Sequence, residues 1–349
     1  EAHRSTFGEM LQTIKQTCPN ALSFGFTGTP ILAENKKKDT TTSMVFGSEL
    51  HRYSIADGIR DGNVLGFDVY QVTTFKDADV RKAVALEKAK ASNVDEALAD
   101  TRKKEVFYRY INEVPMGPSQ DELGRSRESI EGHLSQAQYG DDTAHKDMVV
   151  SDILDQFQVL SHGGKFHAIL ATSSIPEAIT YYRKFKDQAP RLNVTALFDS
   201  SVDNSDGAIV KGDALEEIIE DYNSCYRKSF TIPTWALMKK DIAARLAHKT
   251  PYVTIDRDRD ERIDLLIVVD QMLTGFDSKW VNTLYLDKII QFESIIQAFS
   301  RTNRVFGPDK PFGTVRYYRK PHTMKCNIET AVKLYSGEKP LDIFCLLYT

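Results

Sequence analysis

The stretch QAFSRTNR, from Gln297 to Arg304, places two arginines three positions apart. On a helix, Arg301 and Arg304 would project from the same face. A guanidinium group is always charged and presents a rigid fork of donors, so a pair of them can stabilise charge on a transferring γ-phosphoryl group. Two arginines at this spacing more often mark a solvated helix face. The stretch therefore indicates phosphoryl chemistry only in combination with other motifs.

Two other stretches place glycine and polar side chains at the end of an apolar run. In LTGFD, Gly275 would let the backbone approach a phosphate closely, and Asp277 could accept a hydrogen bond from a ribose hydroxyl or hold an arginine. In GFTGTP, the hydroxyls of Thr27 and Thr29 could bind a neighbouring acid or phosphate. Each stretch is weak evidence alone, because turns of this composition are common.

The elements that must position these residues alternate between strand and helix from about residue 165 onward. Four apolar runs predict strands: KFHAILATSS, RLNVTALFDSS, IDLLIVVDQMLTGFD and VNTLYLDK. The runs between them predict helices, one of which has Pro176 near its first turn. This alternation predicts a parallel, doubly wound α/β sheet, whose functional residues gather at the carboxyl ends of the strands. Those ends hold Thr27–Pro30, Thr172–Ser174 and Thr274–Asp277.

The first 160 residues have a different character. ALSFGFTGTP at 21–30 predicts a buried strand that ends in a turn, and NVLGFDVYQVTTF at 63–75 predicts a second strand. The stretch 78–160 is rich in Ala, Lys and Glu and predicts helices joined by a polar loop. The charged runs ENKKKD at 34–39 and YYRKPHTMK at 317–325 favour solvated surface over a defined DNA contact.

Composition excludes several classes of protein. Of the 349 residues, 41% are apolar and 27% charged, which is typical of a globular protein and excludes disorder throughout. The net charge of −4 excludes a polycation that coats nucleic acid indiscriminately. The four cysteines show no zinc-site spacing, so we expect no metal site built from them. The longest apolar run, LLIVV, is far too short to span a bilayer, and we expect a cytoplasmic protein without membrane contact.

Taken in chain order, EAHRS, GFTGTP, LIVVDQMLTGFDSKWVNTLYLDK and QAFSRTNRV resemble the later half of a superfamily 2 helicase motor. Together with YSIADGIRDGNVLGF at 53–67, they are similar to the restriction subunit, HsdR, of type I restriction-modification systems. The resemblance implies parallel-sheet, RecA-like motor lobes, the first incomplete and the second complete, joined by a helical connector. The implied divisions are the end of the first lobe at 1–77, the connector at 78–160, the second lobe at 161–320 and the start of a C-terminal extension at 321–349.

The resemblance also implies catalytic roles. EAH at the start of the chain is similar to an Asp-Glu-Ala-His box without its Asp, so Glu1 would orient the attacking water. His3 would link the nucleotide to the Thr-Gly-Thr-Pro turn. Arg304 would be an arginine finger, and Arg301 would be its partner on the phosphates. Ser300 stands where many superfamily members have glycine.

Binding roles follow from the same resemblance. The residues expected to bind ATP or to couple its hydrolysis to movement are Thr27, Gly28, Thr29, Gly275, Asp277 and Gln297. The residues expected to contact DNA, through phosphates rather than bases, are Thr172, Ser173 and Thr274. The implied partners are double-stranded DNA and the methylation and specificity subunits of a type I complex.

No G-x-x-x-x-G-K-[ST] phosphate loop occurs in the 349 residues. We therefore expect ATP and Mg²⁺ to need residues outside this chain, and the chain alone to be inactive. In the intact subunit, the resemblance implies an ATP-dependent DNA translocase that acts before cleavage by a nuclease domain, also outside this chain. Two alternatives are another superfamily 2 helicase or translocase, and a non-catalytic nucleic-acid-binding module.

Overall fold

A seven-stranded sheet forms the centre of the protein, in the order β5-β6-β4-β7-β8-β1-β9. The computed structural model describes residues 13–14, 16–36, 40–121, 125–135, 137–140, 143–198, 208–269, 273, 275–337 and 345–348. The strands are β1 Phe67–Gln71, β4 His167–Thr172, β5 Val194–Leu197, β6 Leu265–Val268, β7 Val281–Asp287, β8 Gly313–Tyr317 and β9 Cys345–Tyr348. Every pair of neighbours in this sheet is parallel, which confirms the predicted fold class.

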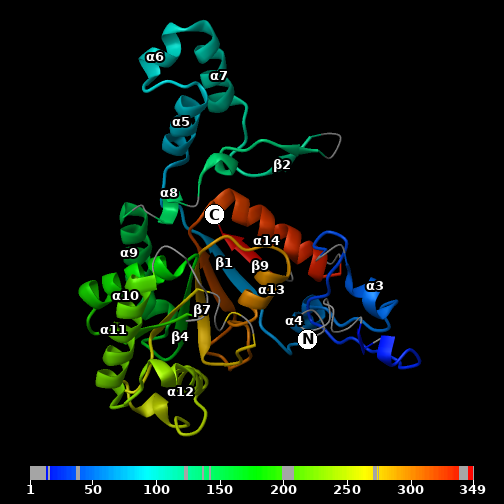
Figure 1. Ribbon diagram of the computed structural model, residues 1–349, viewed down its shortest axis with the longest axis vertical. Helices are drawn as coiled ribbons and strands as arrows, with labels where there is room; N and C mark the ends of the chain where they lie inside the picture. Colours follow the sequence, from blue (N-terminus) through cyan, green and yellow to red (C-terminus); the bar gives the residue numbers. More distant parts are fainter. Residues whose placement is uncertain are drawn as a thin grey trace.

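Helices cover the sheet, and all residues of β4, β5, β6 and β7 are buried, as parallel strands with covered faces require. In Figure 1, α9 to α12 lie to the left of the sheet, and α13 and α14 lie to its right. Their bounds are α9 Thr143–Leu160, α10 Ile175–Gln188, α11 Ala208–Tyr226, α12 Trp235–Ala247, α13 Glu293–Phe299 and α14 Pro321–Tyr335. None of the described helices is long and apolar enough to cross a membrane.

Strand β1 lies in a different place from the one we expected. The strand expected at 63–75 forms, but it pairs with β8 from Phe67 opposite Gly313 to Gln71 opposite Tyr317. Phe67 is buried and packs edge-to-face on Phe299, with ring centroids 5.5 Å apart. The division at residue 77 gave this strand to the first lobe, whereas in the structure β1 lies in the same sheet as β4 to β8.

The strand expected at 21–30 does not form. No strand among the described residues pairs with this stretch, so its apolar side chains have nothing to pack against. Leu22 is 87% exposed and Phe26 is 81% exposed. Two short helices follow, α3 Thr42–Phe46 and α4 Ile55–Arg60. Ser54 begins α4 with a capping box, in which its hydroxyl accepts from the amide of Asp57.

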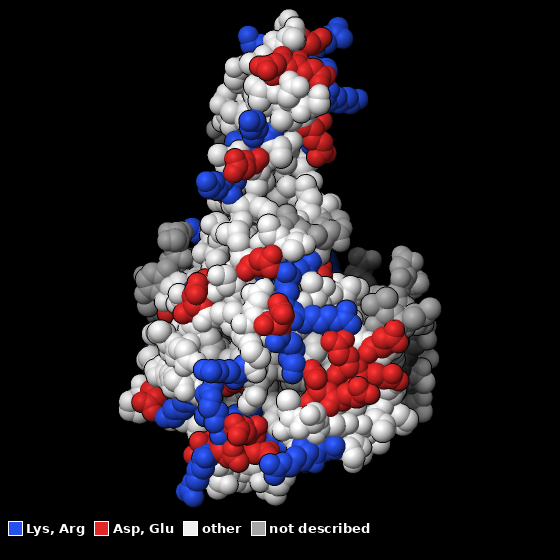
Figure 2. Space-filling view, turned by 90° about the vertical axis from the view of Figure 1, so that its left-hand side faces the viewer, with Lys and Arg blue, Asp and Glu red and all other residues white. Residues whose placement is uncertain are grey.

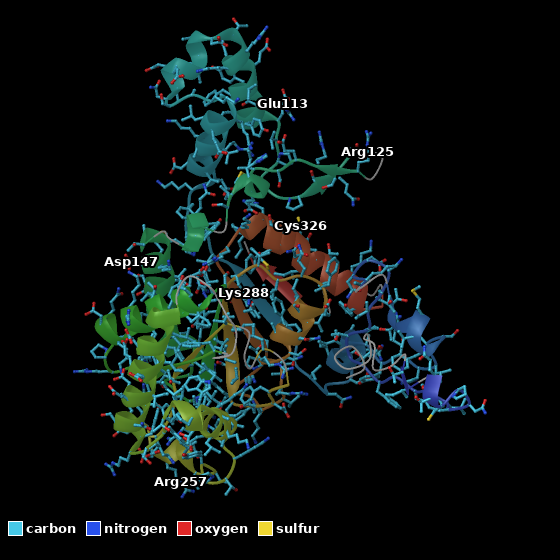
Figure 3. The ribbon with its side chains drawn as sticks, in the orientation of Figure 1. Glu113, Arg125, Asp147, Arg257, Lys288 and Cys326 are labelled. Carbon is cyan, nitrogen blue, oxygen red and sulfur yellow. The ribbon has the colours of Figure 1, made fainter. Side chains whose placement is uncertain are left out.

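Residues 77–135, which we call the arm, form a separate projection at the top of Figure 1. The arm contains α5 Asp77–Lys88, α6 Val94–Ala99, α7 Thr101–Asn112, and a hairpin of β2 Ser119–Gln120 and β3 Ser126–Arg127. It has an apolar core of its own, centred on Val84, Phe107, Tyr110 and Ile130. Figure 3 shows Glu113 and Arg125 on the arm, far from Arg257 at the opposite end. The predicted connector is therefore an ordered subdomain.

Helix α9, at the end of the expected connector, belongs to the main core instead. Its residues Val149, Val150, Ile153 and Phe157 are buried in the cluster that contains the strands. The short helix α8, Ala137–Gly140, precedes it. The division at 160 placed α9 in the connector, whereas in the structure its apolar face covers the sheet rather than the arm.

The arm is joined to the main body at the first turn of α14. The buried carboxylate of Glu131 accepts from the amides of His322 and Thr323, at 3.0 and 2.6 Å. A carboxylate at this position satisfies free amide groups and interacts favourably with the helix dipole. The ammonium of Lys320 donates to the carbonyl of Leu134 at 2.5 Å. This hydrogen bond is the second contact that holds the arm against the start of α14.

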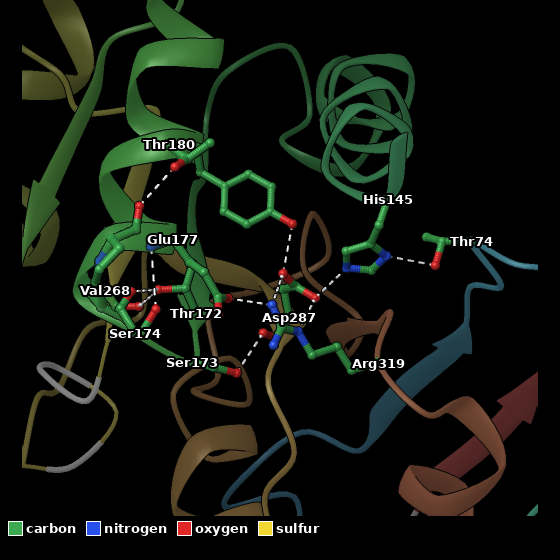
Figure 4. Close-up of polar contacts among 12 residues, drawn as sticks. Thr74, His145, Thr172, Ser173, Ser174, Glu177, Thr180, Val268, Asp287 and Arg319 are labelled. Carbon is green, nitrogen blue, oxygen red and sulfur yellow. Dashed lines mark hydrogen bonds and ion pairs between the residues drawn. The ribbon is translucent and has the colours of Figure 1, made fainter. Parts of the chain in front are cut away.

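A buried carboxylate, Asp287, ends β7 and gathers side chains from several elements (Figure 4). It accepts from Arg319 at 2.7 and 2.9 Å, from Tyr181 at 2.7 Å, and contacts His145 at 2.8 Å. His145 in turn contacts the hydroxyl of Thr74 at 2.7 Å. Burial alone would raise the pKa of Asp287, but the hydrogen bonds from His145 and Arg319 hold it well below its ordinary value.

The burial of Arg319 corrects one expectation. The run at 317–325 was predicted to be solvated charge, but Arg319 and Tyr318 are fully buried, and Lys320 contacts the arm. Arg319 also pairs with Glu177 on α10. Arg319 is thus the partner of two buried acids, which charge pattern alone does not reveal.

A second buried pair, His167 and His248, lies at the start of β4. One nitrogen of His167 contacts the carbonyl of Ile263 at 2.5 Å, and its other nitrogen lies 2.8 Å from Nε2 of His248. His248 stacks on Trp280 with ring centroids 3.8 Å apart. Because a carbonyl only accepts, His167 Nδ1 carries a proton, and His167 Nε2 accepts from His248. Burial lowers the pKa of His167 to about 3 and that of His248 to about 4.

Replacing Arg319 with Met should lower the free energy of unfolding by about 3–5 kcal/mol, because Asp287 would keep its charge without a cationic partner. Urea unfolding of the variant and the wild type measures this loss. Arg183→Met is the matched control, because its ion pair with Glu217 is half exposed, and its loss should cost about 0–1 kcal/mol. Equal losses in the two variants would contradict the role given to Asp287.

The histidine pair should make the protein less stable in mild acid. Both pKa values are lowered by folding, so the unfolded chain binds more protons between about pH 6.5 and pH 4, and stability falls as the pH falls through that window. From pH 7 to pH 5 the loss should be about 2 kcal/mol per histidine. His248→Asn, which tolerates the positive φ of 49° at this position, should lose less over the same range in urea unfolding. An unchanged loss would exclude His248 as its source.

Candidate functional site

The two arginines of the QAFSRTNR stretch lie beyond helix α13, not on it. The helix ends at Phe299, with Ser300 as its C-cap. The hydroxyl of Ser300 donates to the carbonyl of Ile296 at 2.6 Å, and that of Thr302 donates to the carbonyl of Phe299 at 2.9 Å. Such local bonds compete with continuation of the helix. The expectation of one shared helix face is therefore wrong, although both arginines still reach the loop at Gly275–Asp277.

Arg301 and Arg304 lie against the loop that follows β6. Arg301 donates to the carbonyls of Gln297, at 3.0 Å, and Phe276. Arg304 forms an ion pair with Asp277 at 2.7 Å, in which the two side chains are 43% and 65% exposed. A pair this exposed is worth only about 0–1 kcal/mol, so Arg304 could exchange Asp277 for a phosphate oxygen at little cost.

Gly275 gives this loop its path. Its φ of 74° lies in the left-handed region, which a residue with a Cβ adopts only at a cost. The turn brings the carbonyl of Phe276 and the carboxylate of Asp277 toward the arginines. The stretches LTGFD and QAFSRTNR therefore contact each other in the structure. Thr274 lies outside the described residues.

The third stretch, at Thr27–Pro30, contacts the same helix. Gln297 donates to the hydroxyl of Thr29 at 2.9 Å, and Thr29 is buried. The amide of Thr29 donates to the hydroxyl of Thr27 at 3.1 Å, and Gly28 between them is exposed. Residues that are 268 positions apart thus meet through one hydrogen bond. Of the expected coupling residues, Thr29 and Gln297 touch directly.

A polar cluster that sequence reasoning missed supports this contact. The amide nitrogen of Asn35 donates to Glu293 on α13 at 2.9 Å and to the hydroxyl of Tyr335 on α14 at 3.0 Å. Tyr335 donates to the carbonyl of Pro30 at 3.2 Å. Asn35 is buried, although it lies in a run interpreted as solvated charge. A neutral residue between charged ones gives no sequence signal of such a role.

Two residues expected to contact DNA take part in bonds within the sheet edge (Figure 4). Thr172 is fully buried, and its hydroxyl donates to the carbonyl of Val268 at 3.2 Å. Ser173 is partly exposed and donates to the carbonyl of Asp287 at 3.3 Å. Thr172 therefore has no surface to offer a ligand in this conformation, whereas Ser173 does.

Glu1 and His3 lie outside the described residues. Within the described ranges, no three His, Cys, Asp or Glu side chains lie together in a way that could hold a metal ion.

The outer side of α9 to α12 is an unfavourable surface for DNA. Figure 2 shows that side, on which acidic and basic side chains are both gathered. Over the part of the chain that the structure describes, no continuous basic surface lies there. Because DNA affinity depends on neutralised phosphates, we expect the contact elsewhere.

Comparison with protein families finds two matches. Residues 164–320 match the family of type I restriction enzyme subunit R, domain 3. Residues 1–104 match the SWI2/SNF2 ATPase family. The stretch Thr27–Pro30 lies in the SWI2/SNF2 match, and the stretches LTGFD and QAFSRTNR lie in the match to domain 3 of subunit R.

Curated relatives agree with the first match. An endonuclease subunit of a type I restriction enzyme from Staphylococcus saprophyticus is 33% identical over 352 residues, which cover 98% of this chain and 32% of the relative. A putative subunit of the same kind from Methanocaldococcus jannaschii is 27% identical and covers 98% of this chain and 27% of the relative. The chain thus spans about a third of the length of these relatives.

Among solved structures, a fragment of a putative HsdR subunit of a type I restriction enzyme from Vibrio vulnificus covers 97% of this chain and 46% of its own. It is 13% identical, and its TM-score is 0.49.

Replacing Gln297 with Ala should loosen the stretch at 27–36 from α13. The loss of one hydrogen bond, about 1 kcal/mol, should speed amide hydrogen exchange in that stretch about fivefold. Thr29→Val should have the same effect, because it removes the acceptor. Ser294→Ala, at an exposed position of the same helix, is the control and should change nothing. Unchanged exchange in both variants would show that the contact does not hold the stretch.

Proposed function

The chain belongs to the restriction-subunit family of type I restriction enzymes, and we propose that it forms part of the ATP-dependent motor that moves double-stranded DNA past such an enzyme. The observation that carries the proposal is the placement of Arg301 and Arg304 against the loop at Gly275–Asp277. Two exposed or partly exposed guanidinium groups at the carboxyl edge of a parallel sheet suit a γ-phosphate that approaches from another lobe.

In this proposal the arginines exchange partners during each cycle. ATP binds between the two motor lobes, and Arg304 leaves Asp277 for the γ-phosphate as the lobes close. Arg301 leaves the carbonyl of Phe276 in the same step. Charge that develops on the γ-phosphate is then stabilised by both groups. When the lobes open after hydrolysis, the internal contacts form again.

The contact between Gln297 and Thr29 provides a path for coupling. Gln297 lies four positions before Arg301, whose guanidinium donates to its carbonyl. A shift of Arg301 toward a phosphate therefore changes the surroundings of Gln297 and, through it, of Thr29. The stretch Thr27–Pro30 would pass that change to the lobe with which it moves.

The proposed motor would also contact DNA, Mg²⁺ and partner subunits. Ser173 and Thr274 would contact DNA phosphates, which permits movement over any sequence. Thr172 would support Ser173 from within the sheet edge. Bound Mg²⁺ would offset charge on the ATP phosphates, with ligands from outside the described residues. Methylation and specificity subunits would assemble with the intact protein, and its nuclease domain would cut the DNA after translocation.

Replacing Arg304 with Ala in the complete restriction subunit should lower DNA-stimulated ATP hydrolysis by about 10³-fold or more, the range known for removal of an arginine finger. Assembly with the partner subunits should be retained, because the side chain of Arg304 is partly exposed and its ion pair with Asp277 is weak. Steady-state hydrolysis with and without DNA measures the first effect, and size-exclusion chromatography measures the second.

Arg257→Ala is the matched control, since Arg257 is also exposed but lies at the opposite end of the molecule (Figure 3). It should leave hydrolysis within about twofold of the wild type. Turnover that survives in the Arg304 variant would remove this residue from the mechanism.

A further inference from the structure

Lys310 is a buried lysine in the turn that follows the arginines. It is 1% exposed, and its Nζ donates to the carbonyls of Val281 at 2.7 Å and Lys279 at 3.0 Å. Its own amide donates to the carbonyl of Gly307 at 3.0 Å, which closes the turn. An amine that is taken out of water must be compensated by hydrogen bonds. Here both acceptors are backbone groups at the entrance to β7.

Those two acceptors connect the arginine segment to the loop that the arginines face. The stretch 279–281 directly follows the loop at Gly275–Asp277, and Lys310 lies six positions after Arg304. On the other side of Arg304, the carbonyl of Asn303 accepts from the amide of Leu65 at 2.8 Å. Arg304 is therefore a partly exposed residue between two segments that are held by hydrogen bonds.

Arg301, Arg304 and Lys310 all connect the arginine segment to the stretch 276–281, but their contacts differ in burial and in whether a ligand could replace them. The contacts from Arg301 and Arg304 involve side chains that must leave their partners to bind a phosphate. The contacts from Lys310 are buried and do not involve a residue that would bind the nucleotide. The hydrogen bonds of Lys310 can therefore persist when Arg301 and Arg304 leave their partners.

We propose that Lys310 is a positioning residue for ATP hydrolysis, which keeps the arginine segment fixed to the entrance of β7 while Arg301 and Arg304 exchange partners. This inference rests on the proposed function. We call the two hydrogen bonds from Lys310 to the carbonyls of Lys279 and Val281 the tether. Without it, the arginines would reach the γ-phosphate from a less defined position, and small misplacements at a reacting centre reduce turnover strongly.

The tether does not depend on the protonation of Lys310. Burial lowers the pKa of Lys310 to about 7, and the nearby charge of Arg304 acts in the same direction. A protonated amine has three N–H groups and a neutral one has two, so either form can donate to two carbonyls.

The test is Lys310→Met in the complete restriction subunit, with Lys165→Met as the matched control. Lys165 lies in the same neighbourhood, where it pairs with the exposed Asp309. Lys310→Met should lower kcat of DNA-stimulated ATP hydrolysis about tenfold and change KM less than about twofold. It should also speed amide exchange at 301–306. Lys165→Met should do neither.

A double-mutant cycle separates positioning from a general loss of structure. In the background of Arg304→Lys, which retains a cation, Lys310→Met should lower kcat clearly less than tenfold, since it acts through Arg304. A full tenfold loss in that background would overturn the inference. So would unchanged exchange at 301–306, or an equal effect of Lys165→Met.

A second variant covers the case in which Lys310→Met does not fold. Lys310→Gln retains a donor and should show an intermediate loss of kcat with the same dependence on Arg304. If Arg304→Lys alone leaves kcat unchanged, the proposed function fails. If Arg304→Lys lowers kcat but the Lys310 variants behave independently of it, only the further inference fails.

Discussion

The carboxylate of Asp287 determines how the carboxyl edge of the sheet is arranged. It has no contact with water, so its charge is tolerated only because other groups donate to it. Those groups come from α9, from α10 and from the segment before α14, as His145, Tyr181 and Arg319. One buried charge therefore fixes three elements relative to β7. The loops at this edge therefore start from elements whose positions are fixed.

The contacts at the candidate site are weaker and more exposed than those of Asp287. Arg304 is partly exposed and pairs with the exposed Asp277, and Arg301 donates to backbone carbonyls rather than to a buried charge. Such contacts are weak enough to be exchanged for a ligand. The chain thus combines a sheet edge fixed by a buried charge with arginines that are held by weaker contacts. This arrangement would suit the proposed site, in which the arginines bind and release a phosphate in every cycle.

Local patterns predicted the helices and strands well where packing agreed with them. Helix α10 begins at Ile175, and Pro176 lies in its first turn, where the sequence predicted it. The strand predicted at 21–30 does not form, because a strand needs a neighbouring strand to pair with, and an apolar run alone does not provide one. The grouping of Gly275 with Arg304 followed from order along the chain, whereas the pairing of Arg319 with Asp287 and of Asn35 with Glu293 depends on tertiary contacts. No local signal distinguishes such buried partners from solvated charge.

The pairing of β1 with β8 also constrains how the chain is made. Phe67 and its partner Gly313 are 246 positions apart, so at 5–20 residues per second the ribosome needs roughly 12–50 s to deliver the second strand after the first. The arm, whose contacts are local, is complete long before that. Until then β1 presents unpaired amides and carbonyls on a nascent chain, which is a hazard for aggregation. Synthesis of this protein therefore passes through a stage in which one short strand has not yet received its partner.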